Sequence, residues 1–255
     1  MTDDTTSLRD LLTRVASGEI DPAEAARLLD EDPTVPTIDR TSVPTSTVGV
    51  VIKAGGVKLT VLHDPGVDTA YVEGPHALHE EGGTLVIEMP SGEGYRTTDA
   101  PRFLGWVPSV WTGGRGEKVT VRINPELPLT IEATACAVEV VGHSAPLALR
   151  CTSSSIKIRG HRGTVTGSVT MSSLDVDGLL TGPGSLVCEL GSVNLRMLPG
   201  SDLALRTTGE LSSIKINGEK TDLGFDAEGR HTRIGAGSTP YDLSVRMGSA
   251  TVVAA

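Results

Sequence analysis

Large apolar residues recur at a nearly fixed interval in the second half of the chain, from about residue 127 onward. Six segments align on their first large apolar residue: AVEVVG, SIKIRG, SLDVDG, SVNLRM, SIKING and TVVAA, with anchors at Val138, Ile156, Leu174, Val193, Ile214 and Val252. The first four anchors are 18, 18 and 19 residues apart, the fifth follows after 21, and the last after 38, about two periods. A period near 20 residues is typical of stacked coils, in which each coil completes the core of its neighbours.

The positions around the anchors indicate how the coils stack. A second apolar column stands two residues after the first, so the residues between the columns point outward. These outward residues are Glu139, Lys157, Asp175, Asn194 and Lys215. Neighbouring coils lie about 4.8 Å apart, which brings opposite charges side by side. The small residues before the anchors suit tight corners, and they are Ala137, Ser155, Ser173, Ser192, Ser213 and Thr251. The pattern predicts a mainly β fold, a parallel β-solenoid-like stack over residues 127–255.

Residues 47–126 are predicted to form a further β segment. Alternating apolar and polar residues, separated by glycine turns, predict strands at Val48–Ile52, Val57–Leu62, Thr69–Glu73, Leu85–Met89 and Val119–Ile123. Residues 94–116 interrupt this pattern with a loop rich in glycine, proline and aromatic residues.

The N-terminal part has a different period. Leu8, Leu11, Leu12 and Val15 share one helical face, and Asp21-Pro22-Ala23-Glu24 is a helix start, so residues 1–31 are predicted to form a small helical hairpin. Residues 32–46 contain three prolines and are predicted to be a semi-extended linker that tethers the hairpin to the β domain.

The segments LALRCTSSSIKIRG, LALRTTGELSSIKING and LSVRMGSATVVAA resemble a bacterial β-strand-repeat family of unknown function, often labelled "putative adhesin". Several members of that family also carry a short helical hairpin like LLTRVASGEIDPAEAARLLD, followed by a linker. The resemblance covers most of the chain except residues 95–111. It implies links to envelope-stress systems and to self-assembly, and it implies no catalytic residues.

Charge and cysteine usage narrow the classes of function. The net charge is −10, of which residues 1–40 contribute −6, and there is no basic stripe for nucleic acid or anionic lipid. The N-terminus has no signal-peptide pattern and no apolar run is long enough to cross a bilayer, so we expect a cytoplasmic location. Three cysteines, none in CxxC spacing, fit reduced thiols.

Candidate chemical sites are weak. Cys151 and Cys188 fall in one column with Val169 between them, which places them two coils apart, too far for a disulfide. His76 and His79 in HALHEE could ligate a metal, but a solvated turn is the preferred interpretation. The outward charges alternate, and no carboxylates cluster as in polysaccharide-cleaving β-helices. We therefore expect no enzymatic activity, no cofactor and no metal.

The loop contains an unusual concentration of aromatic residues: Tyr95, Phe103, Trp106 and Trp111. One interpretation is a lid that shields the solenoid core. The alternative is an exposed anchor for a protein partner or a membrane surface, because large aromatic side chains dominate interface energetics.

The sequence therefore suggests a non-enzymatic, self-associating scaffold linked to the bacterial envelope or to a stress response. The last repeat ends without a visible cap, so Val252 and Val253, together with Leu11 and Leu28 of the hairpin, are the predicted self-association residues. A competing interpretation is that Thr221–Thr239 folds back to cap the stack. The alternative functions are a monomeric binding module that uses the aromatic loop and, more remotely, a carbohydrate-active β-helix enzyme.

Overall fold

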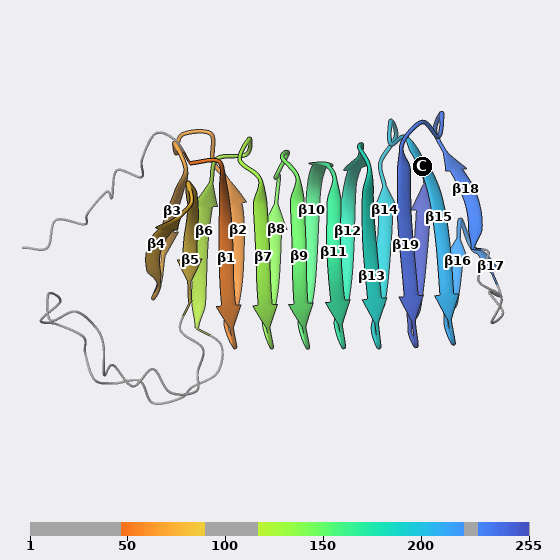
Figure 1. Ribbon diagram of the computed structural model, residues 1–255, viewed down its shortest axis with the longest axis horizontal. Coiled ribbons are helices and arrows are strands. Elements are labelled where there is room, and N and C mark those ends of the chain that lie inside the picture. Colours follow the sequence, from red (N-terminus) through yellow and green to blue (C-terminus); the bar gives the residue numbers. More distant parts are fainter. Residues whose placement is uncertain (1–46, 90–116, 222–228, 255) are drawn as a thin grey trace, which may run out of the picture. The chain divides into compact units, whose positions relative to one another are not determined.

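The computed structural model describes residues 47–89, 117–221 and 229–254, whose regular elements are all strands (Figure 1). They form two ten-stranded sheets, named sheet A and sheet B. In stacking order, sheet A contains β4 (Ala77–Glu81), β5 (Thr84–Glu88), β1 (Gly49–Gly55), β7 (Leu129–Thr134), β9 (Leu147–Thr152), β11 (Val165–Thr170), β13 (Gly184–Glu189), β19 (Pro240–Arg246), β15 (Leu203–Glu210) and β18 (Arg230–Ile234). Sheet B contains β3 (Ala70–Glu73), β6 (Lys118–Ile123), β2 (Lys58–His63), β8 (Ala137–Val141), β10 (Ser155–Gly163), β12 (Ser173–Leu180), β14 (Ser192–Met197), β20 (Ser249–Ala254), β16 (Ser213–Ile216) and β17 (Glu219–Thr221).

The two sheets lie one behind the other and enclose a single core (Figure 1). Most neighbouring strands are parallel, and the antiparallel pairs are those of the outermost strands, β3 with β6, β4 with β5, β15 with β18 and β16 with β17. Through most of the stack one strand of sheet A leads through a tight corner into one strand of sheet B. The mainly β, largely parallel fold is thus confirmed as β-solenoid-like. The predicted hairpin and linker, residues 1–31 and 32–46, lie outside the described residues.

The predicted register is confirmed for four anchors. Val138 pairs with Ile156, Ile156 with Leu174, and Leu174 with Val193, and all four side chains are buried. Alternation along each strand places these residues in the core, where burying an aliphatic side chain stabilises the fold by about 1.5–3 kcal/mol. The predicted alignment of Val252 is wrong by two residues, because Ala250 pairs with Val193 whereas Val252 pairs with Leu195 and Ile216 in the second column.

The order of the coils in space differs from their order in the chain. Strands β19 and β20, the last in sequence, insert between the coil of β13 and β14 and the coil of β15 and β16. The expected open edge at the last repeat is therefore wrong, because β20 is hydrogen-bonded on both sides. The end of the stack carries antiparallel β17 and β18 instead. Strand β18 lies within Thr221–Thr239, the segment that the competing interpretation proposed as a cap, and β17 ends where that segment begins. At the other end β3 and β4 have the corresponding role.

The corners between the sheets use the left-handed region of backbone conformation. The residue after each sheet A strand that leads directly into a sheet B strand has a positive φ, and in stacking order these residues are Gly56, Ala135, Ser153, Met171, Leu190, Met247 and Leu211. The backbone amide of each of the first six donates to the carbonyl of the residue that precedes the next corner. A small residue follows, such as Gly191, where an added Cβ would lie 2.2 Å from the carbonyl oxygen of Ser172. The corner thus lies two residues earlier than predicted. The predicted small residues begin their sheet B strands except in the last coil, where Ser249 has this position instead of Thr251.

Candidate interaction surface

The outer face of sheet B carries the predicted ladder of alternating charges. Lys157 stands beside Glu139 on one side and Asp175 on the other. The Asn194 side-chain amide donates to Asp175 Oδ1 over 2.6 Å. In the next row, one guanidinium nitrogen of Arg196 lies 3.5 Å from a carboxylate oxygen of Asp177. The outward orientation and the order of the ladder are confirmed from Glu139 to Asn194. The predicted neighbour Lys215 is one coil further on, because Thr251 of β20 stands between it and Asn194.

A shallow groove of about 450 Å³ follows this ladder. It is lined by the side chains of Lys157, Arg159, Asp175, Asp177, Asn194 and Arg196, over Ile158 and Val176. Both of its carboxylates already contact a neighbouring side chain, and the lining contains no histidine, cysteine or serine. The groove can therefore make charged and polar contacts, and it offers no nucleophile with a paired base.

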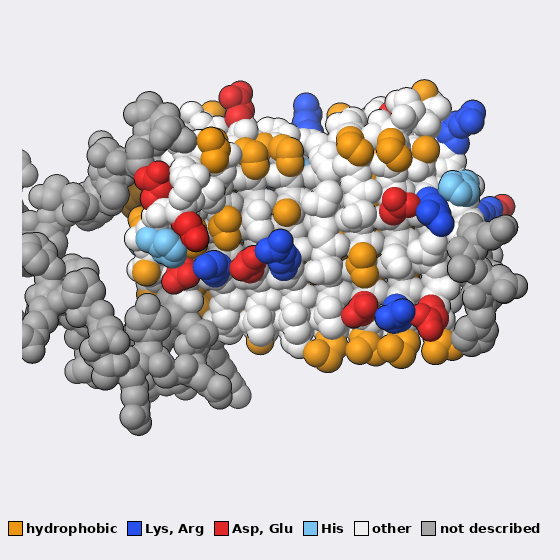
Figure 2. All heavy atoms as spheres, in the orientation of Figure 1, with side chains coloured by type: hydrophobic (Ala, Val, Ile, Leu, Met, Phe, Trp, Pro, Cys, Tyr) orange, Lys and Arg blue, Asp and Glu red, His pale blue; other side chains and the backbone are white. Residues whose placement is uncertain are grey.

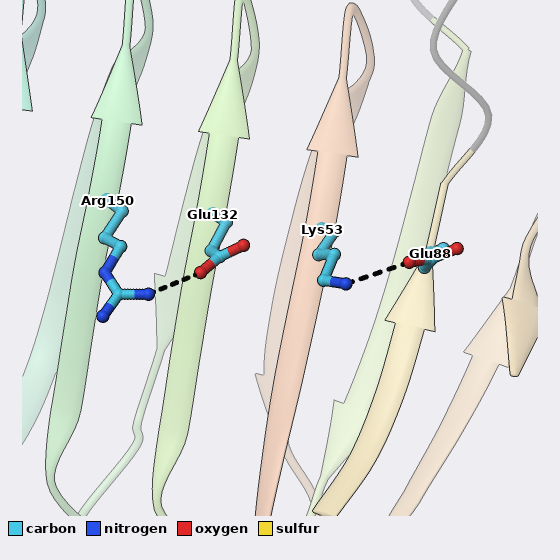
Figure 3. Close-up of polar contacts among 4 residues, drawn as sticks. All are labelled: Lys53, Glu88, Glu132 and Arg150. Atoms are coloured by element: carbon cyan, nitrogen blue, oxygen red, sulfur yellow. Dashed lines mark hydrogen bonds and ion pairs between the residues drawn. The ribbon is translucent and has the colours of Figure 1, made fainter. Parts of the chain in front are cut away.

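The outer face of sheet A has a second ladder across β5, β1, β7 and β9 (Figure 3). Lys53 donates to Glu88 over 3.1 Å, and Arg150 donates to Glu132 over 2.8 Å. The hydrogen bond to Glu88 raises the pKa of Lys53 above its ordinary value. Such exposed pairs contribute little to stability, because water screens them. Their alternation does favour this order of the strands, because moving one strand by one coil would place like charges beside each other.

Two histidines are buried together on the inner side of sheet B. Their rings stack with centroids 5.9 Å apart, and His143 and His161 are almost fully inaccessible. His161 faces inward because a bulge at Gly160 shifts the alternation of β10. Neither ring nitrogen of His143 has a hydrogen-bond partner among the described residues. Burial, together with the nearby His161, lowers the pKa of His143 to about 4. His143 lies in the connection between β8 and β9, whereas His161 belongs to β10.

An apolar ridge runs along one corner edge of the stack. Four successive corner residues, Met171, Leu190, Met247 and Leu211, have side chains that are 54%, 50%, 46% and 64% exposed. Their φ values lie between 49° and 55°, a conformation that costs a residue other than glycine about 1–2 kcal/mol. The same corners elsewhere use Gly56, Ala135 and Ser153, so the turn itself does not need a large side chain.

A row of charged residues borders the ridge on its sheet A side. Glu189, Arg246 and Glu210 end β13, β19 and β15 and pair with one another across the sheet. Arg246 Nε donates to Glu210 over 2.9 Å, and Arg246 Nη1 lies 3.8 Å from Glu189. Figure 2 shows hydrophobic side chains gathered along the lower edge beneath these strands, next to the acidic–basic–acidic row. An apolar strip with a polar border is the usual anatomy of a protein interface.

The cysteines are buried thiols without disulfides. Cys151 and Cys188 lie in one column on either side of Val169, as predicted, and both are free, as is Cys136. Burial raises the pKa of the Cys151 thiol to about 11 and that of the Cys188 thiol above its ordinary value. A thiol with a raised pKa is a poor nucleophile and a poor metal ligand.

Only one residue of the predicted histidine pair lies on a strand. His79 belongs to β4, and His76 precedes that strand and contacts the Gly74 carbonyl oxygen at 2.7 Å. Within the described ranges, no group of three or more histidine, cysteine or acidic side chains is placed to hold a metal ion. Those ranges also contain no helix long and apolar enough to cross a membrane.

Of the other predicted site residues, the structure describes only Val252 and Val253. Tyr95, Phe103, Trp106 and Trp111 lie outside the described residues, as do Leu11 and Leu28. Val252 is fully buried in the core, so its side chain is not available for self-association in the folded chain, whereas Val253 is 45% exposed on the outer face of sheet B.

Sequence reasoning did not identify the apolar ridge, although part of the signal was present. Met171, Leu190 and Leu211 each stand three residues before an anchor, in the column that contains Ala135 and Ser153. When the residues of a corner column change from small to large and apolar halfway along a stack, the change indicates an exposed apolar strip on that part of the surface. Met247 was hidden because its coil follows Leu211 in sequence but precedes it in the stack.

Comparison with known proteins gives little further information. No family model matches the chain, and no curated protein matches it. The fold is similar to the crystal structure of a putative cell adhesion protein from Clostridium sporogenes, over 83% of this chain and 95% of that chain, with a TM-score of 0.41 and 9% sequence identity. The function proposed below does not depend on this similarity.

Proposed function

We propose that this protein is a non-enzymatic β-repeat scaffold whose surface binds protein partners. One observation carries the proposal, namely the four large apolar side chains of the ridge at corner positions where the fold needs only a small residue. Exposed apolar strips with charged borders are typical of protein–protein interfaces. The two charged ladders support the same interpretation, because they are satisfied within the chain and contain no arrangement of nucleophile and base.

The cellular setting is part of this proposal. Three free, buried thiols agree with a reducing compartment, and we place the protein in the cytoplasm. A link to the bacterial envelope or to a stress response rests on the sequence resemblance alone.

The experiment is photo-cross-linking from the ridge in living cells. A photoreactive amino acid replaces Leu190 in the full chain, and the cross-linked proteins are identified by mass spectrometry. The matched control carries the same group at Val187, which is 38% exposed on the outer face of sheet A. We expect specific protein adducts from position 190 and few from position 187. Equal, diffuse labelling from both positions would overturn the proposal.

A second candidate function is a monomeric binding module that uses the aromatic loop. The concentration of Tyr95, Phe103, Trp106 and Trp111 favours it. The double variant Trp106→Ala with Trp111→Ala should lose partner recruitment and keep its melting temperature. Unfolding or aggregation of this variant would instead support the lid interpretation.

A further inference from the structure

We propose that the apolar ridge binds a second copy of this chain, with the two stacks antiparallel about a two-fold axis that crosses the middle of the ridge. This inference rests on the proposed function and names the partner of that surface. The order of the ridge residues, the charges beside them and the symmetry of a dimer support this arrangement.

The order of the residues along the ridge is fixed by strand pairing. It runs Met171, Leu190, Met247, Leu211, since β11, β13, β19 and β15 are consecutive in sheet A. The residues that end those strands give the parallel row Thr170, Glu189, Arg246, Glu210. On the other side of the corner, the sheet B strands begin with Ser173, Ser192, Ser249 and Ser213.

A two-fold axis through the middle of the ridge makes the charges complementary. With the axis perpendicular to the stacking direction, position 171 faces position 211 of the other copy, and position 190 faces position 247. The charged rows then lie on the same side of the interface and run antiparallel, so that Glu189 of each copy faces Arg246 of the other. Both such pairs form at once, because the symmetry repeats every contact.

The alternative arrangements lack this match. A shift by one coil, with Arg246 on the axis, would place Arg246 against Arg246 and Glu189 against Glu210. Pairing the two stacks in the same direction would place the charged row of each copy against the serine column of the other. Like charges that face each other across an interface weaken the association. The order of the charges along the row therefore selects the register in which Glu189 of each copy faces Arg246 of the other.

The ridge also suits contact with another rigid edge. An added Cβ at Gly56, in the same corner column, meets no atom within 4 Å, so side chains at this column project away from the body of the stack. Successive ridge side chains are about 4.8 Å apart, so they form a nearly continuous apolar strip against which an identical antiparallel row can pack. Four apolar residues form only the centre of an interface, and the charged row and the serines would supply its rim.

The first test measures the mass of the purified full chain by sedimentation at several concentrations. We expect a monomer–dimer equilibrium with dissociation in the micromolar range. The ridge variant Met171→Asn, Leu190→Asn, Met247→Asn and Leu211→Asn should be monomeric with an unchanged melting temperature, since asparagine tolerates a positive φ. The control Val187→Thr with Val253→Thr removes two exposed valines elsewhere and should still dimerise.

The second test determines the direction of the stacks. Met171→Cys and Leu211→Cys proteins are prepared separately, mixed and oxidised, while the native cysteines stay buried. The antiparallel arrangement predicts the mixed disulfide between the two proteins, whereas stacks in the same direction would give disulfides between identical proteins. Within one chain these two positions are three coils apart, about 14 Å, which is too far for a disulfide.

The third test exchanges the charges. Glu189→Arg alone should weaken the dimer at least tenfold, and the double variant Glu189→Arg with Arg246→Glu should recover most of the affinity. Failure of the double variant to recover would contradict the antiparallel register.

The outcomes separate this inference from the proposed function. A monomer at about 100 micromolar, or a ridge variant that still dimerises, overturns the self-partner inference. If cross-links from position 190 then lead to a different protein, the scaffold proposal stands. Cross-links to residues 1–46 of the same chain would show that the chain covers its own ridge, and both proposals would fail.

Discussion

At the scale of single residues, the buried histidine pair is the least expected feature. His143 stacks on His161, and both are buried in a chain whose core is mostly aliphatic. His63 contacts the Gly142 carbonyl oxygen nearby. The folded chain holds His143 neutral, because burial and the neighbouring imidazole disfavour its cation. The pKa of His161 is lowered by burial as well. A pair of this kind makes the stability of the fold sensitive to acid.

The folded pKa of His143, about 4, lies below its ordinary value of 6.5, so the unfolded chain binds a proton that the folded chain does not. Stability should therefore fall as the pH decreases from about 6.5 to about 4, by up to about 3 kcal/mol for this residue. Urea unfolding at a series of pH values measures the effect. His143→Phe should flatten the dependence, although His161 will preserve part of it. The control His231→Gln, at an exposed residue of β18, should leave the profile unchanged. A wild-type profile that is flat over this range contradicts the prediction.

At the scale of elements, each coil combines a strand that buries its anchors with a corner that exposes its turn residue. Ile214 is fully buried in β16, and Leu211, three residues earlier, is 64% exposed at a corner. The two residues are both aliphatic, and the backbone alone decides which one enters the core. Strand alternation directs Ile214 inward, whereas the positive φ of Leu211 turns its side chain outward.

This difference predicts opposite responses to substitution. Leu211→Asn should change the free energy of unfolding by less than about 0.5 kcal/mol, as for most surface substitutions. Ile214→Ala should lower it by about 2–5 kcal/mol, because it leaves a cavity in the core. Denaturant titrations at low protein concentration, where association is minimal, give both values. A large loss of stability in Leu211→Asn would mean that the side chain packs against the fold, and the ridge would lose its interpretation as a binding surface.

At the scale of the whole molecule, the described strands of the β domain share one hydrophobic core. The chain divides into two units, Met1–Ser42 and Val43–Ala255, and the core cluster begins at Val50 and ends at Val252. Antiparallel strands cover both ends of the stack, which reduces the open edges available to another chain. We therefore expect association through a side of the stack and not through its ends.

Deletion of residues 1–40 should leave the melting temperature of the β domain nearly unchanged, because the described residues from Val50 to Val252 share one core cluster. Circular dichroism during heating measures this, with the full chain as the reference. Sedimentation of the truncated protein should show the same dimer if the ridge mediates it. A collapse of the β domain, or loss of the dimer with the fold intact, would show that the N-terminal segment contributes to the core or to assembly.

The sequence by itself determined the class of the fold, the anchor register from Val138 to Val193, the outward charge ladder and the separation of Cys151 from Cys188. These features are local or periodic, and alternation along a strand makes them visible in one dimension. The order of the coils was decided only by tertiary structure. Strands β19 and β20 would add one ladder of hydrogen bonds to each sheet whether they stood inside the stack or at its end, so the number of hydrogen bonds does not decide the order. The order depends on non-local contacts with β13 to β16, which neither periodicity nor composition expresses. The apolar ridge follows from the same insertion, because only the stacked order brings Met247 between Leu190 and Leu211.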